Sequence, residues 1–266
     1  MQERHSDRQR YFEEQAYTTE KYVIPFVQPF LPIGPEHRIL EVGCGEGGNL
    51  KPFLDLGCNC VGVDLNAQQI ERAKDFYGDH VHQAKLELIA VDVYDLNPET
   101  LGTFDFIFLR DVIEHIVDQD RFMGYIKAYL KPAGRLFLGF PPWYMPFGGH
   151  QQVCSSKVLS KLPYFHLLPV PLYRMLLKAF GESQAVIDEL LYIKSTGISI
   201  ERLRKIIGTN GYQIDHEQLW LINPNYEVKF GLKKREQFGF ISVLPFLRNF
   251  LTTCGYYVVS LPNRLP

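Results

Sequence analysis

The feature that most constrains the fold is a glycine-rich turn that directly follows a short apolar run. Residues 38–42 are Arg-Ile-Leu-Glu-Val, and residues 43–48 are Gly-Cys-Gly-Glu-Gly-Gly. An apolar run of this length is typical of a strand buried on both faces of a parallel sheet. Glycines let the backbone turn tightly and let a ligand approach closely, because they have no Cβ atom. The pattern therefore predicts a strand, a turn, and a helix whose N-terminal N–H groups face a ligand.

Strand-like and helix-like stretches alternate through the first 140 residues. Short apolar runs predict further strands at 60–64, 86–91, 104–109 and 135–140. Helical spacing of apolar residues predicts helices at 9–30, 48–56, 66–76 and 118–130. Such alternation indicates βαβ units and a largely parallel sheet, so we expect an α/β fold with helices layered on both faces.

The regular alternation stops after residue 140 and resumes only near residue 199. Helical stretches are predicted near 155–161, 170–180 and 183–193, and the whole segment is too long for an ordinary loop. We expect an α-helical lid over the substrate. The rest of the chain predicts a helix at 199–209, strands at 212–222 and 256–261, and an irregular stretch at 223–253 that could wall the pocket. We expect one domain, residues 1–266. It would consist of an N-terminal helical segment (1–35), a cofactor-binding half (36–140), a lid insertion (141–197) and a C-terminal part of the sheet (198–266).

Composition narrows the possible partners. The formal net charge is -2, so no overall positive field attracts nucleic acid, and we expect none as a partner. The five cysteines are odd in number and lack zinc-site spacing, which favours reduced thiols and a cytoplasmic protein. No apolar stretch reaches the length of about 18 residues that a transmembrane helix needs. The apolar segment 167–180 leaves peripheral membrane contact open, and the sequence leaves the oligomeric state open.

Two acidic residues stand at the expected ends of the second and third strands. Asp64 is placed where the hydroxyls of a ribose could donate hydrogen bonds to a carboxylate. That position suits both NAD and S-adenosylmethionine, and Gly43, Gly45 and Gly48 also satisfy the G-x-G-x-x-G spacing of NAD-binding domains. Asp92 is placed where an adenine amino group could donate to it, and this second acid favours S-adenosylmethionine.

Together these motifs resemble the class I, Rossmann-like S-adenosylmethionine-dependent methyltransferases of the type 11/12 kind. The resemblance covers residues 36–140 well and the rest only in general plan; Ala133 stands where a glycine is usual. It implies a seven-stranded, mostly parallel sheet whose last strand is antiparallel and lies between the fifth and sixth. It also implies that Glu41 lies beside the methionine portion, Asp64 at the ribose and Asp92 at the adenine. The full set of implied cofactor-binding residues is Glu41, Gly43, Cys44, Gly45, Gly47, Asp64, Leu65, Asp92, Val93, Arg110 and Asp111.

Two histidines are candidates for catalysis. The methyl group of a sulfonium is already activated, so a base is needed only where the acceptor is a weak nucleophile such as a hydroxyl. His150 follows the predicted fifth strand and is the first candidate base, and His115 is the weaker candidate. Asp111, Glu114 and His115 resemble in part an acid-x-x-Glu-His arrangement of ubiquinone-pathway O-methyltransferases, which bind a divalent cation there. Because the match is partial, we expect no metal.

The sequence thus predicts methyl transfer from S-adenosylmethionine, with S-adenosylhomocysteine as product, to a small-molecule, lipid or saccharide acceptor, with oxygen as the favoured atom. An NAD-dependent oxidoreductase or epimerase is an alternative. The catalytic Tyr-x-x-x-Lys pair expected of it is missing, since Tyr125 and Lys127 have the wrong spacing. A non-catalytic cofactor-binding protein is another alternative. A nucleic-acid methyltransferase is disfavoured by the near-neutral charge.

Overall fold

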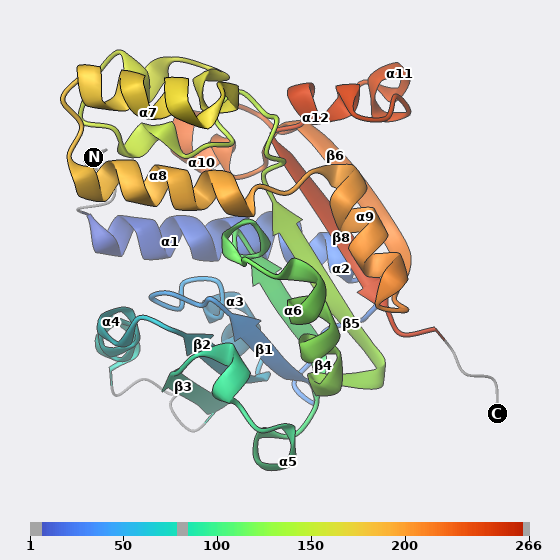
Figure 1. Ribbon diagram of the computed structural model, residues 1–266. Helices are drawn as coiled ribbons and strands as arrows, with labels where there is room; N and C mark the ends of the chain where they lie inside the picture. The colour runs from blue at the N-terminus through green and yellow to red at the C-terminus, as the bar shows by residue number, and fades with distance from the viewer. Residues whose placement is uncertain (1–6, 79–84, 263–266) are drawn as a thin grey trace.

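The computed structural model describes residues 7–78 and 85–262, which form an eight-stranded sheet with helices on both faces (Figure 1). The strand order is β3-β2-β1-β4-β5-β8-β6-β7. The strands are β1 (Arg38–Val42), β2 (Asn59–Asp64), β3 (Leu86–Ala90), β4 (Phe104–Arg110), β5 (Leu130–Phe140), β6 (Gln213–Ile222), β7 (Arg235–Glu236) and β8 (Cys254–Ser260). All seven strands predicted from the sequence are present.

The sheet is parallel from β3 to β5 and antiparallel around β8. β8 pairs with β5 on one side and with β6 on the other, which confirms the expected antiparallel strand between the fifth and sixth. The expected count of seven strands was wrong, because β7 adds an eighth strand at the edge beside β6. β7 has only two residues, too few for any period-2 pattern in the sequence.

Helices pack against both faces of the sheet and bury two hydrophobic cores. One core collects side chains from α1 (Arg8–Thr18), α2 (Ile24–Val27), α3 (Lys51–Asp55) and α4 (Ala67–Tyr77). The other collects side chains from α6 (Gln119–Ile126) and α9 (Ile200–Thr209), near the short α5 (Pro98–Leu101). A π-helical turn, Thr19–Val23, joins α1 to α2, so the helix predicted at 9–30 is present with a local irregularity.

Several elements differ from the prediction. The helix expected at 118–130 ends at Ile126, and in place of the helix expected near 155–161 the structure has a short 3-10 turn, Leu159–Lys161. The helix expected at 48–56 begins only at Lys51, and residues 48–50 form a turn in which the Leu50 N–H donates to the Gly47 carbonyl at 2.9 Å. Pro52 then occupies the first turn, where its missing N–H group costs nothing. β5 begins at Leu130 rather than at residue 135, and an irregular register with β4 between Phe104 and Phe106 accommodates the extra residues.

The segment after β5 carries α7 (Val170–Ala179) and α8 (Gln184–Thr196) and has a small core of its own. That core consists of Cys154, Leu159, Phe165, Tyr173, Leu177, Ile187 and Leu190. In Figure 1, α7 and α8 lie beyond the carboxyl end of β5. Thr196 Oγ1 donates to the Glu114 carbonyl at 2.6 Å, and Tyr192 Oη donates to the His115 carbonyl at 3.1 Å. α8 is therefore fastened to the segment that follows β4.

The stretch 223–253 is not irregular, contrary to the prediction. It holds α10 (Tyr226–Phe230), β7, α11 (Gly239–Ser242) and α12 (Leu247–Leu251). Each of these elements has two to five residues, which is shorter than the window that helical or strand periodicity needs. Within residues 7–78 and 85–262, no helix is both long and apolar enough to cross a membrane.

Candidate functional site

The glycine turn after β1 is held in place by Asp64 at the end of β2. Asp64 Oδ2 accepts a hydrogen bond from the Gly45 N–H at 2.8 Å, and Oδ1 accepts one from the Asn66 N–H at 2.8 Å. Gly43 has φ +71°, and a Cβ atom there would lie 2.6 Å from Val112 Cγ2. Any side chain at Gly43 would therefore be strained in its backbone and would collide with the segment after β4.

Two adjoining hollows lie around this turn. The larger has a volume of about 830 Å³ and the smaller about 150 Å³. The combined volume of the two hollows lies within the range of small-molecule sites. Four residues line both hollows: Gly43, Asp64, Gln69 and Asp111. The predicted residues Leu65, Asp92 and Val93 line only the larger hollow, whereas Gly45 and Arg110 line only the smaller.

The three predicted acids do not all face the same space. Asp64 and Asp92 line the larger hollow, and Asp92 Oδ1 also accepts a hydrogen bond from the Tyr94 N–H at 3.0 Å. Glu41 lies behind the hollows with 1% of its surface exposed, and its Oε1 accepts a hydrogen bond from Asn49 Nδ2 at 2.7 Å. Among the residues that the structure describes, Glu41 Oε2 has no partner, and burial raises the pKa of this carboxyl to about 8. Glu41 can reach a ligand only through Asn49, which lines the smaller hollow.

The smaller hollow has a buried cation in its wall. Arg110 is 9% exposed, and its Nη1 donates to Asn49 Oδ1 at 3.1 Å. Its Nε lies 3.8 Å from Asp111 Oδ2. Asp111 has φ +56°, a left-handed conformation that aspartate tolerates better than most residues and that is often found at functional sites. Arg110 and Asp111 thus lie side by side in the wall of this hollow, which is also lined by the charged residues Arg8, Glu14, Glu46 and Lys229.

Besides Glu41, two more of the predicted cofactor residues, Cys44 and Gly47, line neither hollow. The Cys44 side chain is 1% exposed and belongs to the core, so only its backbone faces the turn. Gly47 lines neither hollow, and its carbonyl accepts a hydrogen bond from Tyr77 Oη at 2.7 Å.

The sequence did not single out several residues that line the hollows. They come from α1, from the end of the glycine turn, from α4, from α8 and from α10: Tyr11, Asn49, Gln69, Tyr192 and Lys229. Asn49 is the exception that the sequence could have indicated, because it directly follows the last glycine of the motif. The segment 223–253, predicted as a possible pocket wall, supplies Lys229 and Asn225 to the smaller hollow.

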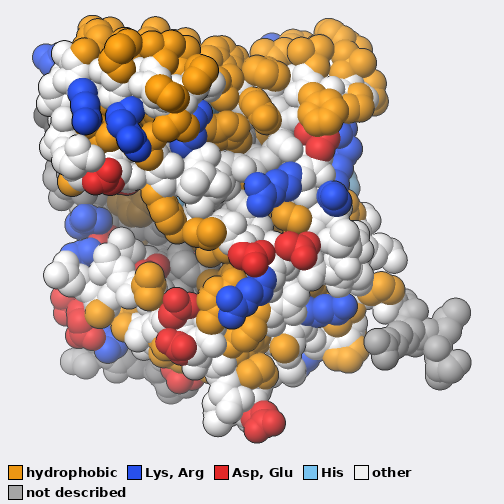
Figure 2. Space-filling model, in the orientation of Figure 1, with side chains coloured by type: hydrophobic (Ala, Val, Ile, Leu, Met, Phe, Trp, Pro, Cys, Tyr) orange, Lys and Arg blue, Asp and Glu red, His pale blue; other side chains and the backbone are white. Residues whose placement is uncertain are grey.

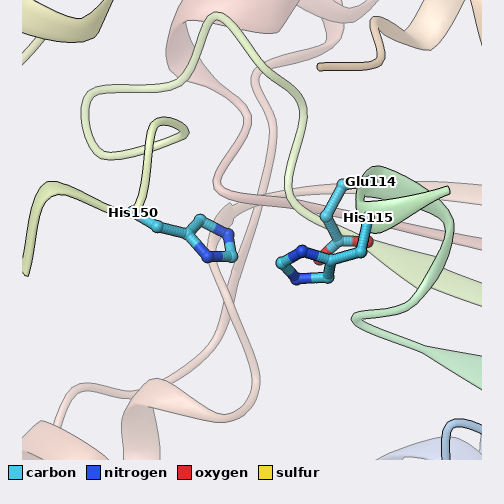
Figure 3. Close-up of side chains that lie close together, drawn as sticks. All are labelled: Glu114, His115 and His150. Carbon is cyan, nitrogen blue, oxygen red and sulfur yellow. The ribbon is translucent and has the colours of Figure 1, made fainter. Parts of the chain in front are cut away.

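The two candidate histidines lie together at the edge of the larger hollow (Figure 3). His115 lines the hollow, and the His150 ring meets the His115 ring edge to face with centroids 5.0 Å apart. Burial lowers the pKa of both imidazoles, and the pKa of His150 falls to about 4. Both rings are therefore neutral at pH 7, which is the form that can accept a proton or bind a metal.

Glu114 lies beside the histidine pair. It is 4% exposed, and within the described part of the chain neither of its carboxylate oxygens has a hydrogen-bond partner. Burial, and secondarily the charge of Asp111, raises the pKa of Glu114. Metal-ligating atoms of Glu114, His115 and His150 all lie within 4.8 Å of one another. One carboxylate and two imidazoles form a donor set that suits a divalent transition metal, so this trio could hold one, with His150 in the place that the sequence resemblance gave to Asp111.

Comparison with known proteins defines the class. Residues 12–151, more than half of the chain, match the sequence family described as a methyltransferase domain. The chain therefore belongs to this family, with the class I, S-adenosylmethionine-dependent kind of fold that the sequence predicted. Membership disfavours the NAD-dependent oxidoreductase that the G-x-G-x-x-G spacing had left open.

Curated relatives match over part of their length. The mitochondrial ubiquinone biosynthesis O-methyltransferase of Homo sapiens is 34% identical over 118 residues, which cover 43% of this chain and 31% of that protein. The ubiquinone biosynthesis O-methyltransferase of Brucella ovis is 34% identical over 154 residues, which cover 56% of this chain and 59% of that protein. The chain thus spans between about a third and three fifths of these relatives.

Solved structures agree on the fold. An S-adenosylmethionine-dependent methyltransferase from Clostridium acetobutylicum has a TM-score of 0.55 at 13% identity, covering 92% of this chain and 91% of that one. A plantazolicin methyltransferase in complex with S-adenosylhomocysteine has a TM-score of 0.53 at 10% identity, covering 95% and 84%. Likeness over nearly the whole chain extends the fold assignment beyond residue 151.

Proposed function

We propose that this chain transfers the methyl group of S-adenosylmethionine to an oxygen atom of a small-molecule acceptor. The observation that carries the proposal is the pair of acids, Asp64 and Asp92, on one hollow of about 830 Å³ that continues into the smaller polar hollow beside Arg110. An elongated ligand with a nucleoside at one end and an amino acid at the other has the polar groups that these two hollows complement.

The nucleoside belongs in the larger hollow. An ionised carboxylate has about four acceptor positions, so Asp64 can bind ribose hydroxyls while it keeps its two backbone hydrogen bonds. Asp92 uses one oxygen to cap the Tyr94 N–H and has the other available for an adenine amino group. Leu65, which is 75% exposed, and Val93 offer apolar contact at the rim and wall of this hollow.

The methionine portion belongs in the smaller hollow. Its carboxylate can pair with the buried Arg110 guanidinium, and its ammonium group can pair with the Asp111 carboxylate. The Arg110 guanidinium is held in place by Asn49, and the backbone of Asp111 is held by its N–H, which donates to the Gly139 carbonyl at 2.8 Å. Such positioning brings the sulfonium to the junction of the two hollows, next to the histidine pair.

The histidine pair supplies the base that a hydroxyl acceptor needs. As the acceptor oxygen bonds to the methyl carbon and the carbon–sulfur bond breaks, the hydroxyl proton passes to a neutral imidazole. His115 has the more direct position, because it lines the larger hollow, whereas His150 does not line it but contacts the His115 ring. This reverses the order that the sequence suggested, with His150 as the support for the His115 ring. Oxygen as the acceptor atom is supported by relatives that are named O-methyltransferases.

A metal-assisted variant of the same reaction is the second candidate. It is favoured by the partnerless Glu114 carboxylate within 4.8 Å of ligating atoms of both histidines. A divalent cation held by this trio would polarise the acceptor oxygen and lower its pKa. In that variant the two imidazoles act as ligands, and their neutral state at pH 7 is what ligation needs.

The proposal is tested by incubating the full chain with methyl-labelled S-adenosylmethionine and a panel of phenols, saccharides and hydroxylated lipids. We expect label on a hydroxyl of one acceptor class together with stoichiometric S-adenosylhomocysteine. Lipids and saccharides remain in the panel because nothing in the hollows excludes them. We also propose that the protein works in the cytoplasm, where its five buried free thiols stay reduced; one relative named as mitochondrial makes the compartment a separate test.

A further inference from the structure

A band of exposed apolar side chains runs over α7 and over the segment that carries α11 and α12 (Figure 2). We call it the apolar ridge. Its members are Val170, Leu172, Met175, Phe180, Phe238, Phe240, Val243, Leu244, Phe246, Leu247 and Leu251. Phe240, Val243 and Phe246 are 69%, 70% and 66% exposed. Soluble proteins rarely expose a contiguous apolar surface of this kind, because leaving it in water costs free energy. Such a surface therefore marks an interaction site.

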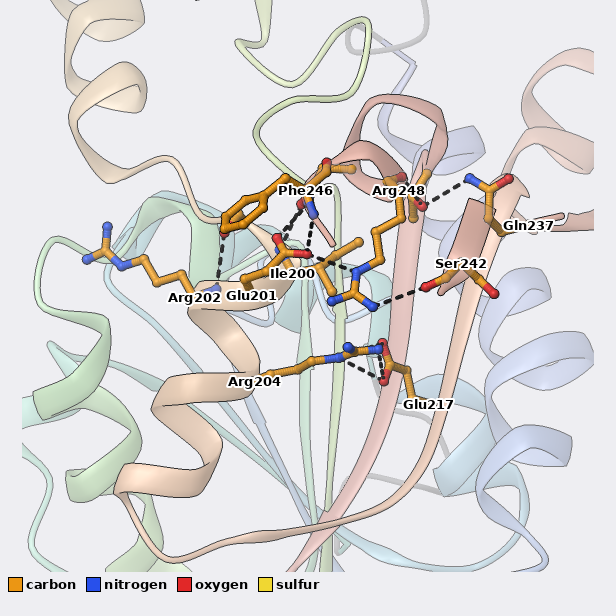
Figure 4. Close-up of polar contacts among 12 residues, drawn as sticks. Ile200, Glu201, Arg202, Arg204, Glu217, Gln237, Ser242, Phe246 and Arg248 are labelled. Atoms are coloured by element: carbon orange, nitrogen blue, oxygen red, sulfur yellow. Dashed lines mark hydrogen bonds and ion pairs between the residues drawn. The ribbon is translucent and has the colours of Figure 1, made fainter. Parts of the chain in front are cut away.

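Hydrogen bonds hold the α11–α12 part of the ridge in a defined conformation. In Figure 4, Glu201 of α9 binds three groups of the α11–α12 segment. Its Oε1 accepts from the Phe246 N–H and from Arg248 Nε, both at 2.9 Å, and its Oε2 accepts from Asn249 Nδ2 at 2.7 Å. The amide of Asn249 is buried and its Oδ1 accepts from the Ile200 N–H at 2.8 Å. These bonds tie the outermost part of the ridge to the helix that packs on the sheet.

The same bonds hold Phe246 in a costly conformation. Its φ is +62°, which is a genuine outlier for a bulky residue. Phe246 is 66% exposed, so packing of its ring against the described residues compensates little of this strain. A strained backbone conformation that surrounding contacts hold in place is typical of a functional position.

Basic side chains predominate beside the α7 part of the ridge. Segment 155–181 contains Lys157, Lys161, Arg174 and Lys178 and no acidic residue, although the whole chain has 30 acidic and 28 basic residues. Arg174 and Lys178 share a shallow hollow on α7 with the apolar Met175. Figure 2 shows Lys and Arg side chains gathered beside the α7 part of the apolar band, with a few acidic side chains farther from it and one beside the band's other end. An apolar face bordered by cations complements a bilayer surface, where acyl chains lie below anionic headgroups.

We propose that the apolar ridge docks on the surface of an anionic lipid bilayer, with α7 and the α11–α12 segment both in contact with it. The docking is peripheral: exposed rings enter the headgroup region, and the lysines and arginines pair with lipid phosphates. A second copy of this chain fits the surface less well. A two-fold dimer would place the ridge against itself, and so would bring the cations of segment 155–181 into like-charge contact.

The experiment is co-sedimentation of the full chain with vesicles of phosphatidylcholine alone and of phosphatidylcholine with phosphatidylglycerol. We expect binding to the anionic vesicles that weakens as salt is raised, and little binding to the neutral ones. The variant Phe240→Asp with Val243→Asp should reduce the apparent affinity for anionic vesicles at least about tenfold. Met175→Asp should also reduce it, because α7 belongs to the same surface.

Leu56→Asp is the matched control, since Leu56 is 42% exposed at the end of α3, outside the ridge. It should bind vesicles like the wild type. Unchanged binding of S-adenosylhomocysteine by each variant shows that the fold is intact and keeps this test independent of the catalytic proposal. The docking proposal is refuted if the wild type does not bind anionic vesicles, or if the ridge variants bind them as the wild type does. It is equally refuted if the ridge variants instead abolish a dimer of the wild type.

Discussion

The imidazole of His150 meets the imidazole of His115 edge to face, with ring centroids 5.0 Å apart. The two residues follow neighbouring parallel strands, β4 and β5, so the sheet itself brings their segments to one edge. Only His115 lines the larger hollow, and Glu114 lies beside both rings. This relationship makes the roles of the two histidines separable by experiment.

Replacing His115 should slow the chemical step without weakening the binding of the cofactor. We expect His115→Asn to reduce kcat by about 100-fold or more on the acceptor identified by the labelled-methyl screen, because a positioned base contributes about that much. His150→Asn should have a smaller effect; asparagine tolerates the left-handed backbone of this position, so the loop keeps its shape. Calorimetry should give both variants the wild-type affinity for S-adenosylhomocysteine. Wild-type turnover by His115→Asn would remove it as the base.

Chelation separates the base mechanism from its metal-assisted variant. With the histidine pair acting as base, exhaustive dialysis against a chelator leaves turnover unchanged, and that is the result we expect. A loss that one divalent ion restores, together with about one ion bound per chain, would instead establish the metal-assisted variant. Glu114→Gln is the companion variant: it should abolish ion binding if the trio holds a metal.

Removing the charge of Asp64 should weaken cofactor binding strongly. An amide nitrogen cannot accept, so Asp64→Asn loses either a backbone hydrogen bond to the glycine turn or its contact with ribose. We expect the Kd for S-adenosylhomocysteine to rise about 10- to 100-fold, which corresponds to about 1.4–2.8 kcal/mol. Asp92→Asn should raise it about tenfold by loss of the adenine contact. Asp75→Asn, on the exposed side of α4, is the control and should bind normally.

The buried carboxyl of Glu41 should make stability depend on pH. Burial raises its pKa from 4.5 to about 8, so between these values the folded chain keeps a proton that the unfolded chain releases. The folded state then binds more protons, and the free energy of unfolding falls as pH rises through this window. The Glu41→Gln variant lacks this titrating carboxyl. As pH rises through this window, its free energy of unfolding should increase relative to that of the wild type by about 1 kcal/mol for each pH unit. Denaturant unfolding of both proteins at pH 5 and pH 8 measures this difference, and parallel pH curves would contradict it.

Local signals in the sequence were sufficient for the sheet and for part of the site. The apolar runs placed all seven longer strands, and parallel pairing then put Asp64 and Asp92 at one edge. β7 and α10–α12 were missed because elements of two to five residues carry no period. Side-chain direction was also beyond the sequence, which is why Cys44 was expected at the cofactor but points into the core.

Long-range relationships were the other limit. The contact of His150 with His115 depends on how the segment after β5 folds back, and no motif encodes that path. Tyr11 and Lys229 reach the smaller hollow from α1 and α10, which are distant in sequence from the glycine turn. Such residues become visible only when packing brings their helices together.

Above all, we propose that the two adjoining hollows form one site for S-adenosylmethionine. Calorimetric titration of the full chain with S-adenosylhomocysteine, and separately with NAD, tests it most directly. We predict one S-adenosylhomocysteine bound per chain with a micromolar Kd, about -8 kcal/mol, and no measurable heat with NAD. Failure to bind S-adenosylhomocysteine at millimolar concentration, or tighter binding of NAD, would contradict the account and would revive a non-catalytic role for the fold.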